Sequence, residues 1–148
     1  ATLGAMAQAT GQVGSALQSL LDAVPGWRAW SLFDRPPLAS AGEMAACRVA
    51  LVGDAAHPMV PYLAQGAGMA IEDAVALADA VGDGEAASLP AAFEHYAAAR
   101  WSRNAQVQAR ARRNGRIFHA TGPVRLGRDL SMRLGGARLL DQPWLYGH

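Results

Sequence analysis

The sequence predicts an α/β chain that is mostly helical and has few strands. Two long segments carry apolar residues at helical spacing, whereas a short apolar run at 47–52 has the length and β-branched content of a strand. Hydrophobic residues make up 51% of the 148 residues and charged residues 17%. This balance supplies apolar material for a core and excludes a disordered chain.

The N-terminal part predicts one helix, one strand and one loop. Apolar residues at helical spacing predict a helix over 3–24, ended by the Pro-Gly pair that follows it. Loose alternation predicts a short strand over 27–33, with Trp30 and Phe33 as apolar anchors. The small and polar residues 40–46 predict a loop.

The strand predicted at 47–52 leads into a loop and a second helix. Its apolar character suits a strand that is covered on both faces of a sheet. Prolines and glycines punctuate the loop at 55–65. Gly66 then opens a helix that runs to about Val81, and a Gly-Asp-Gly turn stops it.

The C-terminal part predicts two more helices. Pro90 lies near the start of a helix that continues to about Arg113. Beyond Asn114 and Gly115 we expect irregular chain, followed by a short helix over 128–140. There is no internal repeat.

The charge of the chain is distributed unevenly. The formal net charge is +1, yet residues 1–99 sum to −7 and residues 100–148 to +8, and all thirteen basic residues are arginine. A basic stripe at helical spacing would suit nucleic acid. The acids of the first 99 residues instead favour a solvated face on which the arginines pair within the chain.

Simple features of the sequence exclude several classes of protein. No apolar run reaches the ~18–20 residues that a membrane span needs, and no basic N-terminus precedes an apolar stretch as in a signal peptide. The single cysteine, Cys47, excludes an internal disulfide and a zinc site built on several cysteines. We therefore expect a soluble, cytoplasmic protein without a metal, in which Cys47 is a small buried hydrophobe.

The strong chemical signal is the stretch 53–68, which reads Gly-Asp-Ala-Ala-His-Pro-Met-Val-Pro-Tyr-Leu-Ala-Gln-Gly-Ala-Gly. Asp54 follows the predicted strand and is placed to accept hydrogen bonds from the hydroxyls of a bound polyol. Gly53 before it allows a ligand to approach the backbone closely. At 66–68, the N–H groups of a helix start favour an anion or a carbonyl that gains negative charge.

This stretch resembles the second flavin-binding motif of the class A FAD-dependent aromatic hydroxylases. Its details are most similar to the salicylate hydroxylase and 3-hydroxybenzoate 6-hydroxylase branch. The downstream residues 70–74, Ala-Ile-Glu-Asp-Ala, extend the likeness, as do the flanking segments 30–35, 113–119 and 144–147. The resemblance covers nearly the whole chain. It implies the C-terminal fragment of an FAD/NAD(P)-binding, Rossmann-like flavoprotein monooxygenase.

The resemblance also implies a role for each matching residue. Asp54 would bind the ribityl chain of FAD, and Pro61 would lie beside the isoalloxazine ring on the substrate side, with no acid–base residue assigned. Backbone amides at 66–68 would face the N1–C2=O2 edge of the flavin. The implied cofactor-binding residues are Gly53, Asp54, Pro61, Gln65, Gly66, Ala67 and Gly68. NAD(P)H would be the co-substrate, and dioxygen and an aromatic small molecule would be the reactants.

The resemblance divides the chain into three parts and leaves part of an enzyme unaccounted for. Residues 1–40 would end the substrate domain, 41–85 would hold the second FAD motif, and 86–148 would form a C-terminal helical region. No Gly-x-Gly-x-x-Gly motif follows a strand, because the glycines at 82 and 84 follow a helix. We therefore expect a missing N-terminal portion, or association into a homo-oligomer.

Alternative interpretations stay open for the whole chain and for single residues. The chain could be a non-catalytic truncated remnant that binds a partner or, less favoured, a basic nucleic-acid-binding module. Asp54 could be a turn or cap acid, His57 favours packing or hydrogen bonding over acid–base catalysis, and Gln65 could bond the loop backbone or reach a flavin. Glu72 and Asp73 lie early in a helix, where the dipole favours acids without any chemistry.

Overall fold

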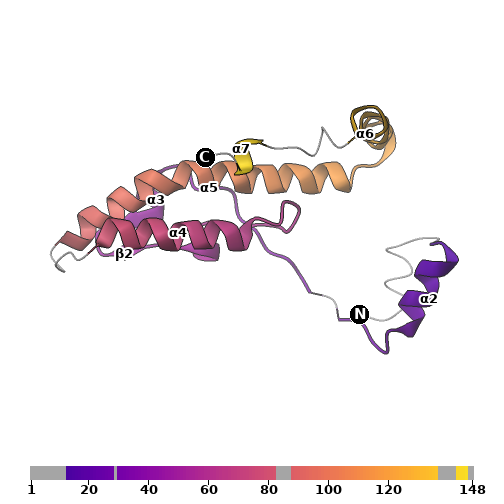
Figure 1. Cartoon of the computed structure of the whole chain (residues 1–148), viewed down its shortest axis with the longest axis horizontal. Helices are drawn as coiled ribbons and strands as arrows, with labels where there is room; N and C mark the ends of the chain where they lie inside the picture. Colours follow the sequence, from indigo (N-terminus) through magenta and orange to yellow (C-terminus); the bar gives the residue numbers. More distant parts are fainter. Residues whose placement is uncertain (1–12, 29, 83–87, 137–142, 147–148) are drawn as a thin grey trace. The chain divides into compact units, whose positions relative to one another are not determined.

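The computed structural model describes residues 13–28, 30–82, 88–136 and 143–146 (Figure 1). The chain divides into two units, Ala1–Leu32 and Phe33–His148. Helices dominate the described residues, and the sheet that they form has only two strands. The prediction of a mostly helical chain with few strands is therefore confirmed.

The first unit contains α2 (Ser15–Ala23), which buries none of its residues. This confirms the helix expected here, although its predicted residues 3–12 lie outside the described part of the chain. The described residues of the segment 27–33 form no strand, so that prediction is wrong. Trp30 and Phe33 are exposed, and no strand among the described residues pairs with this segment.

The second unit begins with a short helix where we expected a loop. α3 (Ala41–Met44) starts after Ser40. The carboxylate of Glu43 accepts a hydrogen bond from the N–H of Ala39 at 2.9 Å. The loop predicted over 40–46 is therefore wrong, since residues 41–44 form a helix whose Glu43 binds the backbone just before its start.

The strand expected over 47–52 is shorter and lies in a hairpin. β1 (Ala45–Ala46) pairs antiparallel with β2 (Val49–Ala50). Val49 is 63% exposed, and Cys47 is exposed in the turn with φ +53°. The expected burial of the strand and of the cysteine is therefore wrong. A strand is buried when both faces of its sheet are covered, and this hairpin leaves Val49 and Cys47 uncovered by the described residues.

A single turn joins the hairpin to the loop before α4. The turn, η1, is a 3-10 helix at Gly53–Ala55. α4 (Gly66–Val81) has the predicted bounds. Gly82 follows it with φ +48°, a conformation that favours glycine. Residues 83 and 84 of the predicted stop lie outside the described residues.

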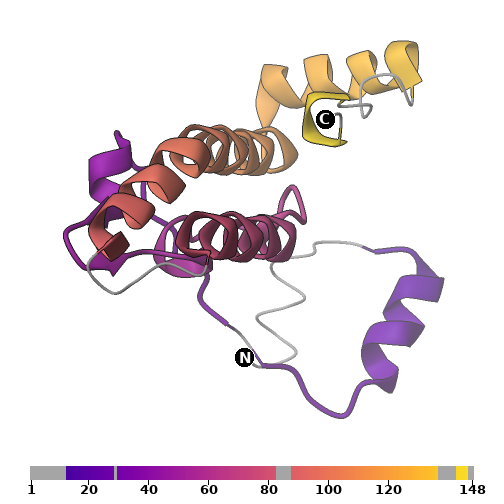
Figure 2. The same cartoon turned by 60° about the vertical axis from the view of Figure 1, so that its left-hand side comes forward.

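α5 (Leu89–Phe118) is a long helix that runs alongside α4 (Figures 1 and 2). Pro90 lies in its first turn, where its missing N–H has no helical partner to lose. The helix continues through Asn114 and Gly115, so the end predicted near residue 113 is wrong. The glycine at 115 serves packing and does not end the helix, since a Cβ there would lie 2.6 Å from Tyr62 Cδ2.

Two shorter helices complete the described chain, α6 (Gly122–Gly135) and α7 (Pro143–Tyr146). The helix expected over 128–140 starts earlier than predicted, because Pro123 in the first turn already fixes a helical backbone angle. Residues 137–140 lie outside the described part. No helix among the described residues is long and apolar enough to cross a membrane.

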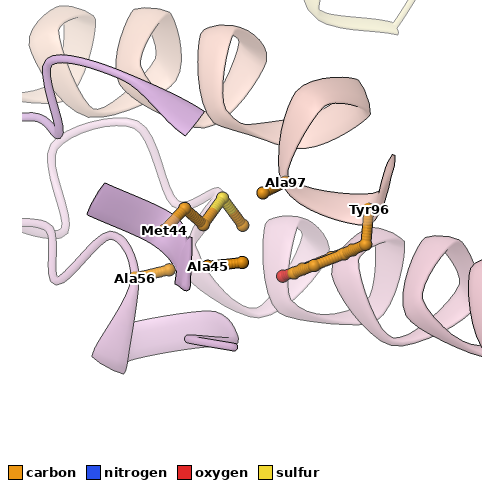
Figure 3. Close-up of a cluster of buried hydrophobic side chains, with 5 residues drawn as sticks. All are labelled: Met44, Ala45, Ala56, Tyr96 and Ala97. Carbon is orange, nitrogen blue, oxygen red and sulfur yellow. The ribbon is translucent and has the colours of Figure 1, made fainter. Parts of the chain in front are cut away.

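Two small hydrophobic clusters hold the second unit together. The first packs the region around the hairpin against α5 and consists of Met44, Ala45, Ala56, Tyr96 and Ala97 (Figure 3). The second joins α4, α5 and α7 and consists of Met69, Val107 and Leu145. Both clusters fix the segment that contains the motif between the hairpin and α4 against the long helix.

Candidate functional site

The turn that leaves the hairpin has a glycine where a larger residue would be strained. Gly53 has φ +58°, and a Cβ there would lie 3.3 Å from the Cβ of Ala70 on α4. The N–H groups of Ala56 and His57 donate to the Gly53 carbonyl at 2.9 Å. The Gly53 N–H donates to Oδ2 of Asp73 at 3.2 Å. The turn is therefore tied to itself and to α4.

Asp54 lies in this turn with its side chain exposed. The carboxylate does not cap η1, and it forms no hydrogen bond or ion pair with any described residue. Asp54 does lie in a turn, but its carboxylate has no backbone N–H to cap among the described residues. Both carboxylate oxygens are available to accept hydrogen bonds from a ligand.

A hollow of about 600 Å³ opens beside Asp54. Its lining residues are Asp54, Met59, Val60, Pro61, Ala64, Gly66, Ala67 and Ala70. The hollow has the size of small-molecule sites, and apart from one carboxylate its side chains are apolar. The structure thus brings Asp54, Pro61, Gly66 and Ala67 together around one hollow.

The start of α4 supplies the polar backbone groups of this hollow. The helical hydrogen bonds begin with the N–H of Met69, which donates to the carbonyl of Gln65 at 2.9 Å. The N–H groups of Gly66, Ala67 and Gly68 come before it and have no acceptor within the helix. Together with the helix dipole, they favour a carbonyl oxygen or an anion at this end.

Three predicted site residues lie beside the hollow and do not line it. Gly53 is the first residue of the turn and is buried. Gln65 precedes the first residue of α4, and a Cβ on Gly68 would lie 3.3 Å from its Oε1. The side chain of Gln65 therefore covers the start of the helix near Gly68.

Beneath the turn lies a buried polar network centred on Asp73. Its Oδ2 accepts a hydrogen bond from His57 Nε2 at 2.7 Å, in addition to the one from the Gly53 N–H. Its Oδ1 accepts from Arg100 Nε at 2.9 Å and from Asn104 Nδ2 at 3.0 Å. Asp73 is fully buried and His57 nearly so. Asp73, on α4, thus links the turn to α5 through its hydrogen bonds.

These hydrogen bonds decide the charge of Asp73. Burial disfavours its ionised form, but the hydrogen bonds from His57, Asn104, Arg100 and the Gly53 amide outweigh burial and hold its pKa well below the ordinary value of 3.8. The helix dipole is therefore not the whole account of Asp73, because its side chain also holds a structural hydrogen-bond network. The expectation that His57 packs and hydrogen-bonds is confirmed.

The loop between the turn and α4 is anchored by side chains from distant segments. Arg35 Nη2 donates to the carbonyls of Ala55 and Ala56 at 2.7 and 2.8 Å. Gln108 Nε2 donates to the carbonyls of Arg35 and Pro58, both at 2.7 Å. These bonds tie the beginning of the motif loop to α5 and hold it without secondary structure of its own.

Three of the six arginines of α5, namely Arg100, Arg103 and Arg112, pair with acids that precede the helix in the sequence. Arg103 Nε and Nη2 donate to Glu72 at 2.7 and 2.9 Å, and Arg100 Nη1 adds a third bond at 2.7 Å. The Arg103 bonds lower the pKa of Glu72 from 4.5 to about 2. Arg112 pairs with Asp34 at 2.9 Å. The prediction of pairing within the chain is confirmed for these arginines.

Reasoning from the sequence missed the network because its members look unremarkable one by one. Arg100, Asn104 and Gln108 are spaced four residues apart and are all buried on one face of α5. A line of polar residues at this spacing, flanked by Ala97 and Val107, is the signal that could have revealed a buried polar stripe.

The sequence also matches known proteins. The profile of the FAD binding domain family matches residues 37–111, which is half of the chain and contains the hairpin, the turn, α4 and most of α5. The chain belongs to the FAD-binding domain family. Residues 37–111, which match the family, include both the hollow beside Asp54 and the buried network around Asp73.

Relatives of this FAD-binding domain are named as monooxygenases and hydroxylases. A 3-amino-4-hydroxybenzoate 2-monooxygenase of Streptomyces platensis is 44% identical over 134 residues, covering 90% of this chain and 33% of the relative. A 3-hydroxybenzoate 6-hydroxylase of Polaromonas naphthalenivorans (strain CJ2) is 42% identical over 132 residues, covering 88% and 32%. A 6-hydroxynicotinate 3-monooxygenase of Pseudomonas fluorescens is 40% identical over 121 residues, covering 80% and 28%. The chain thus spans about a third of the length of these relatives.

Proposed function

We propose that this chain is the C-terminal portion of a flavoprotein monooxygenase that hydroxylates a hydroxybenzoate-type aromatic ring with FAD, NAD(P)H and dioxygen. The observation that carries the proposal is the hollow at the start of α4, where Asp54, Pro61, Gly66 and Ala67 meet. The names of the relatives support the substrate class.

The residues of the hollow fit the flavin end of FAD. Asp54 has both oxygens available for the hydroxyls of a ribityl chain. The apolar wall, which includes Met59, Val60 and Pro61, suits a flat aromatic ring. The N–H groups at 66–68 suit the ring's carbonyl edge. We assign the pyrophosphate and adenosine contacts, with their Rossmann-like fold, to a portion of the protein outside this chain.

Each residue then has a separate task. Asp54 accepts hydrogen bonds that orient the cofactor, and Pro61 forms part of the wall on the substrate side. The amides of Gly66, Ala67 and Gly68 stabilise negative charge where it grows during reduction. When bound, FAD supplies the redox chemistry that moves an oxygen atom from dioxygen to the aromatic ring. Asp73 and His57 hold the turn beneath.

Weak flavin binding by the chain alone provides the direct test. The ¹⁵N-labelled chain is titrated with FAD into the millimolar range, and the amide shifts of Gly66, Ala67 and Gly68 are followed by NMR. We expect saturable shifts at these amides, and Asp54→Ala weakens binding about tenfold. Asp79→Ala, at an exposed acid on α4 that does not line this hollow, is the control and leaves binding unchanged. Absent shifts, or equal affinity in the Asp54 variant, would overturn the proposal.

The gene sequence upstream of the codon for Ala1 tests the C-terminal position separately. We expect an in-frame segment that encodes Gly-x-Gly-x-x-Gly directly after a strand pattern. Stop codons in that frame immediately upstream would contradict the proposal and favour the truncated remnant.

A further inference from the structure

A second hollow, also of about 600 Å³, lies where the motif loop meets the last turns of α5. It lies entirely within the second unit. Val60 lines both this hollow and the one beside Asp54, so the two are neighbours across the loop. Their linings differ in charge. The hollow beside Asp54 has one carboxylate and no cation, whereas the second hollow has two arginines, Arg112 and Arg116, and one acid, Asp34.

The charges in the second hollow do not cancel. Asp34, its acidic residue, accepts a hydrogen-bonded ion pair from Arg112 Nε at 2.9 Å. Arg116 lies one helical turn further along α5 and makes no ion pair or hydrogen bond with any described residue. One guanidinium with five donors is therefore left for a ligand. His119 also lines the hollow, and its Nδ1 donates to the Gly115 carbonyl at 2.9 Å.

The apolar part of the lining is fixed in place. The Tyr62 ring lies against Gly115, with its Cδ2 only 2.6 Å from where a Cβ would stand. It meets the rings of Phe118 and His119 edge to face, with centroids 6.0 and 5.3 Å apart. Asn114 Nδ2 donates to the Tyr62 carbonyl at 3.1 Å. The Tyr62 ring thus packs against the C-terminal end of α5, and this contact restricts the side-chain freedom that would be lost on binding.

We propose that this second hollow binds a small organic anion, namely a carboxylate or phosphate group carried on an apolar ring or chain. Arg116 binds the anionic group with paired N–H donors. Val60 and Tyr62 contact the apolar body. The site adjoins the hollow beside Asp54 and needs no flavin, so it goes beyond the proposed hydroxylase function and stands or fails without it.

Titrations of the ¹⁵N,¹³C-labelled chain with simple anions test the proposal. The probes are sodium benzoate and sodium hexanoate, and the signals are the Arg116 side-chain N–H, the Val60 methyl groups and the Tyr62 ring. We expect saturable shifts at all three residues with at least one probe. The probe that binds more tightly identifies the apolar body as a ring or a chain.

Two variants separate a specific contact from the general positive charge of α5. Arg116→Gln is expected to weaken binding about tenfold or more. Arg113→Gln removes the same charge from an exposed position on the same helix that does not line the hollow, and is expected to leave binding within about twofold. Equal weakening by the two variants would overturn the role of Arg116.

Two further probes test each half of the ligand. Benzyl alcohol keeps the ring without the charge, and inorganic phosphate keeps the charge without the apolar body. We expect both to bind at least about tenfold more weakly than benzoate or hexanoate. If either binds as tightly, the organic-anion assignment is wrong. None of these titrations contains flavin, so a negative result here leaves the FAD titration of Asp54→Ala to be judged separately.

Discussion

Two regions of the molecule each contain an aspartate–arginine ion pair, one buried and one exposed. The buried pair lies in the interface between α4 and α5, and the exposed pair lies on α6. In each, an aspartate is held by arginine side chains. Asp73 accepts from Arg100 with no exposure, whereas Asp129 is 42% exposed where it accepts from Arg128 at 2.6 Å. Asp73 also binds a histidine, an asparagine and a backbone amide. Asp129 instead pairs with two arginines, Arg125 and Arg128.

The difference shows what burial adds to an ion pair. Water competes for every hydrogen bond of an exposed pair and screens its charges, so such pairs contribute little. A buried carboxylate has no such alternative, and losing it leaves its partners unsatisfied inside the protein. At Asp73 those partners include the Gly53 amide and His57, so the buried pair also sets the geometry of the turn that presents Asp54.

Replacing Asp73 is expected to produce the largest effect. Asp73→Ala leaves Arg100 buried without its partner and should lower the free energy of unfolding by about 3–5 kcal/mol. Urea unfolding followed by far-UV circular dichroism measures this loss. Asp79→Ala, at an exposed acid of the same helix, should change stability by less than about 0.5 kcal/mol. Comparable losses in both variants would remove the distinction between the buried and the exposed acid.

Gly53→Ala should have the next largest effect, because Gly53 is the backbone donor of the buried network. The variant forces alanine to φ +58° and brings its Cβ to 3.3 Å from Ala70. We expect a loss of about 1–2 kcal/mol in the free energy of unfolding. Gly66→Ala is the control, since its Cβ would meet Met59 at an ordinary 3.8 Å. A neutral Gly53→Ala would contradict the strain argument.

Acid should weaken the α4–α5 interface through its carboxylates. The pKa of Glu72 falls to about 2, and that of Asp73 also lies below its ordinary value. Groups with lowered native pKa values stabilise the fold fully above their unfolded pKa. We therefore expect stability to decline from about pH 5 towards about pH 2.

Urea midpoints of the native chain and of Glu72→Gln across this pH range provide the measurement. The variant should show a shallower decline, because it lacks one of the carboxylates that must be protonated in acid. Identical pH dependence in the two chains would show that the Glu72 bonds to Arg100 and Arg103 do not govern its ionisation.

Asp129→Asn should have the smallest effect. The variant removes an exposed pair, and Arg128 still donates to the carbonyls of Ile117 and Phe118 at the end of α5, at 3.2 and 2.8 Å. We expect an unchanged unfolding midpoint in the same urea assay. A loss like that of Asp73→Ala would mean that α6 depends on this pair as strongly as the buried interface depends on Asp73.

Local signals in the sequence were enough for the elements that local rules control. Gly66 and Gly82 mark the two ends of α4, and the structure has those bounds. The sequence also indicated which residues would surround the hollow, because Asp54, Pro61 and the start of α4 lie within one short stretch. Their role in binding FAD stays a prediction.

Elements that depend on distant partners were not predictable in this way. Asn114 and Gly115 read as a helix end, since nothing nearby in sequence shows that Tyr62 fills the space beside Gly115. Asp73 read as an ordinary helix acid, because its importance comes from Arg100 and Asn104 on the neighbouring helix. Patterns in a single sequence describe the helix or strand to which a residue belongs. The roles of Asp73 and Gly115 depend on side chains from other segments of the chain.

The contact between Tyr62 and Gly115 has a consequence for how this protein can be recombined. The Tyr62 ring fits against Gly115 because the glycine has no side chain, although the two residues come from different segments of the chain. A chimaera that takes the motif loop from one protein and the long helix from another keeps this contact only where the helix has a residue without a side chain opposite the ring. The loop and the helix must therefore be matched at these two positions.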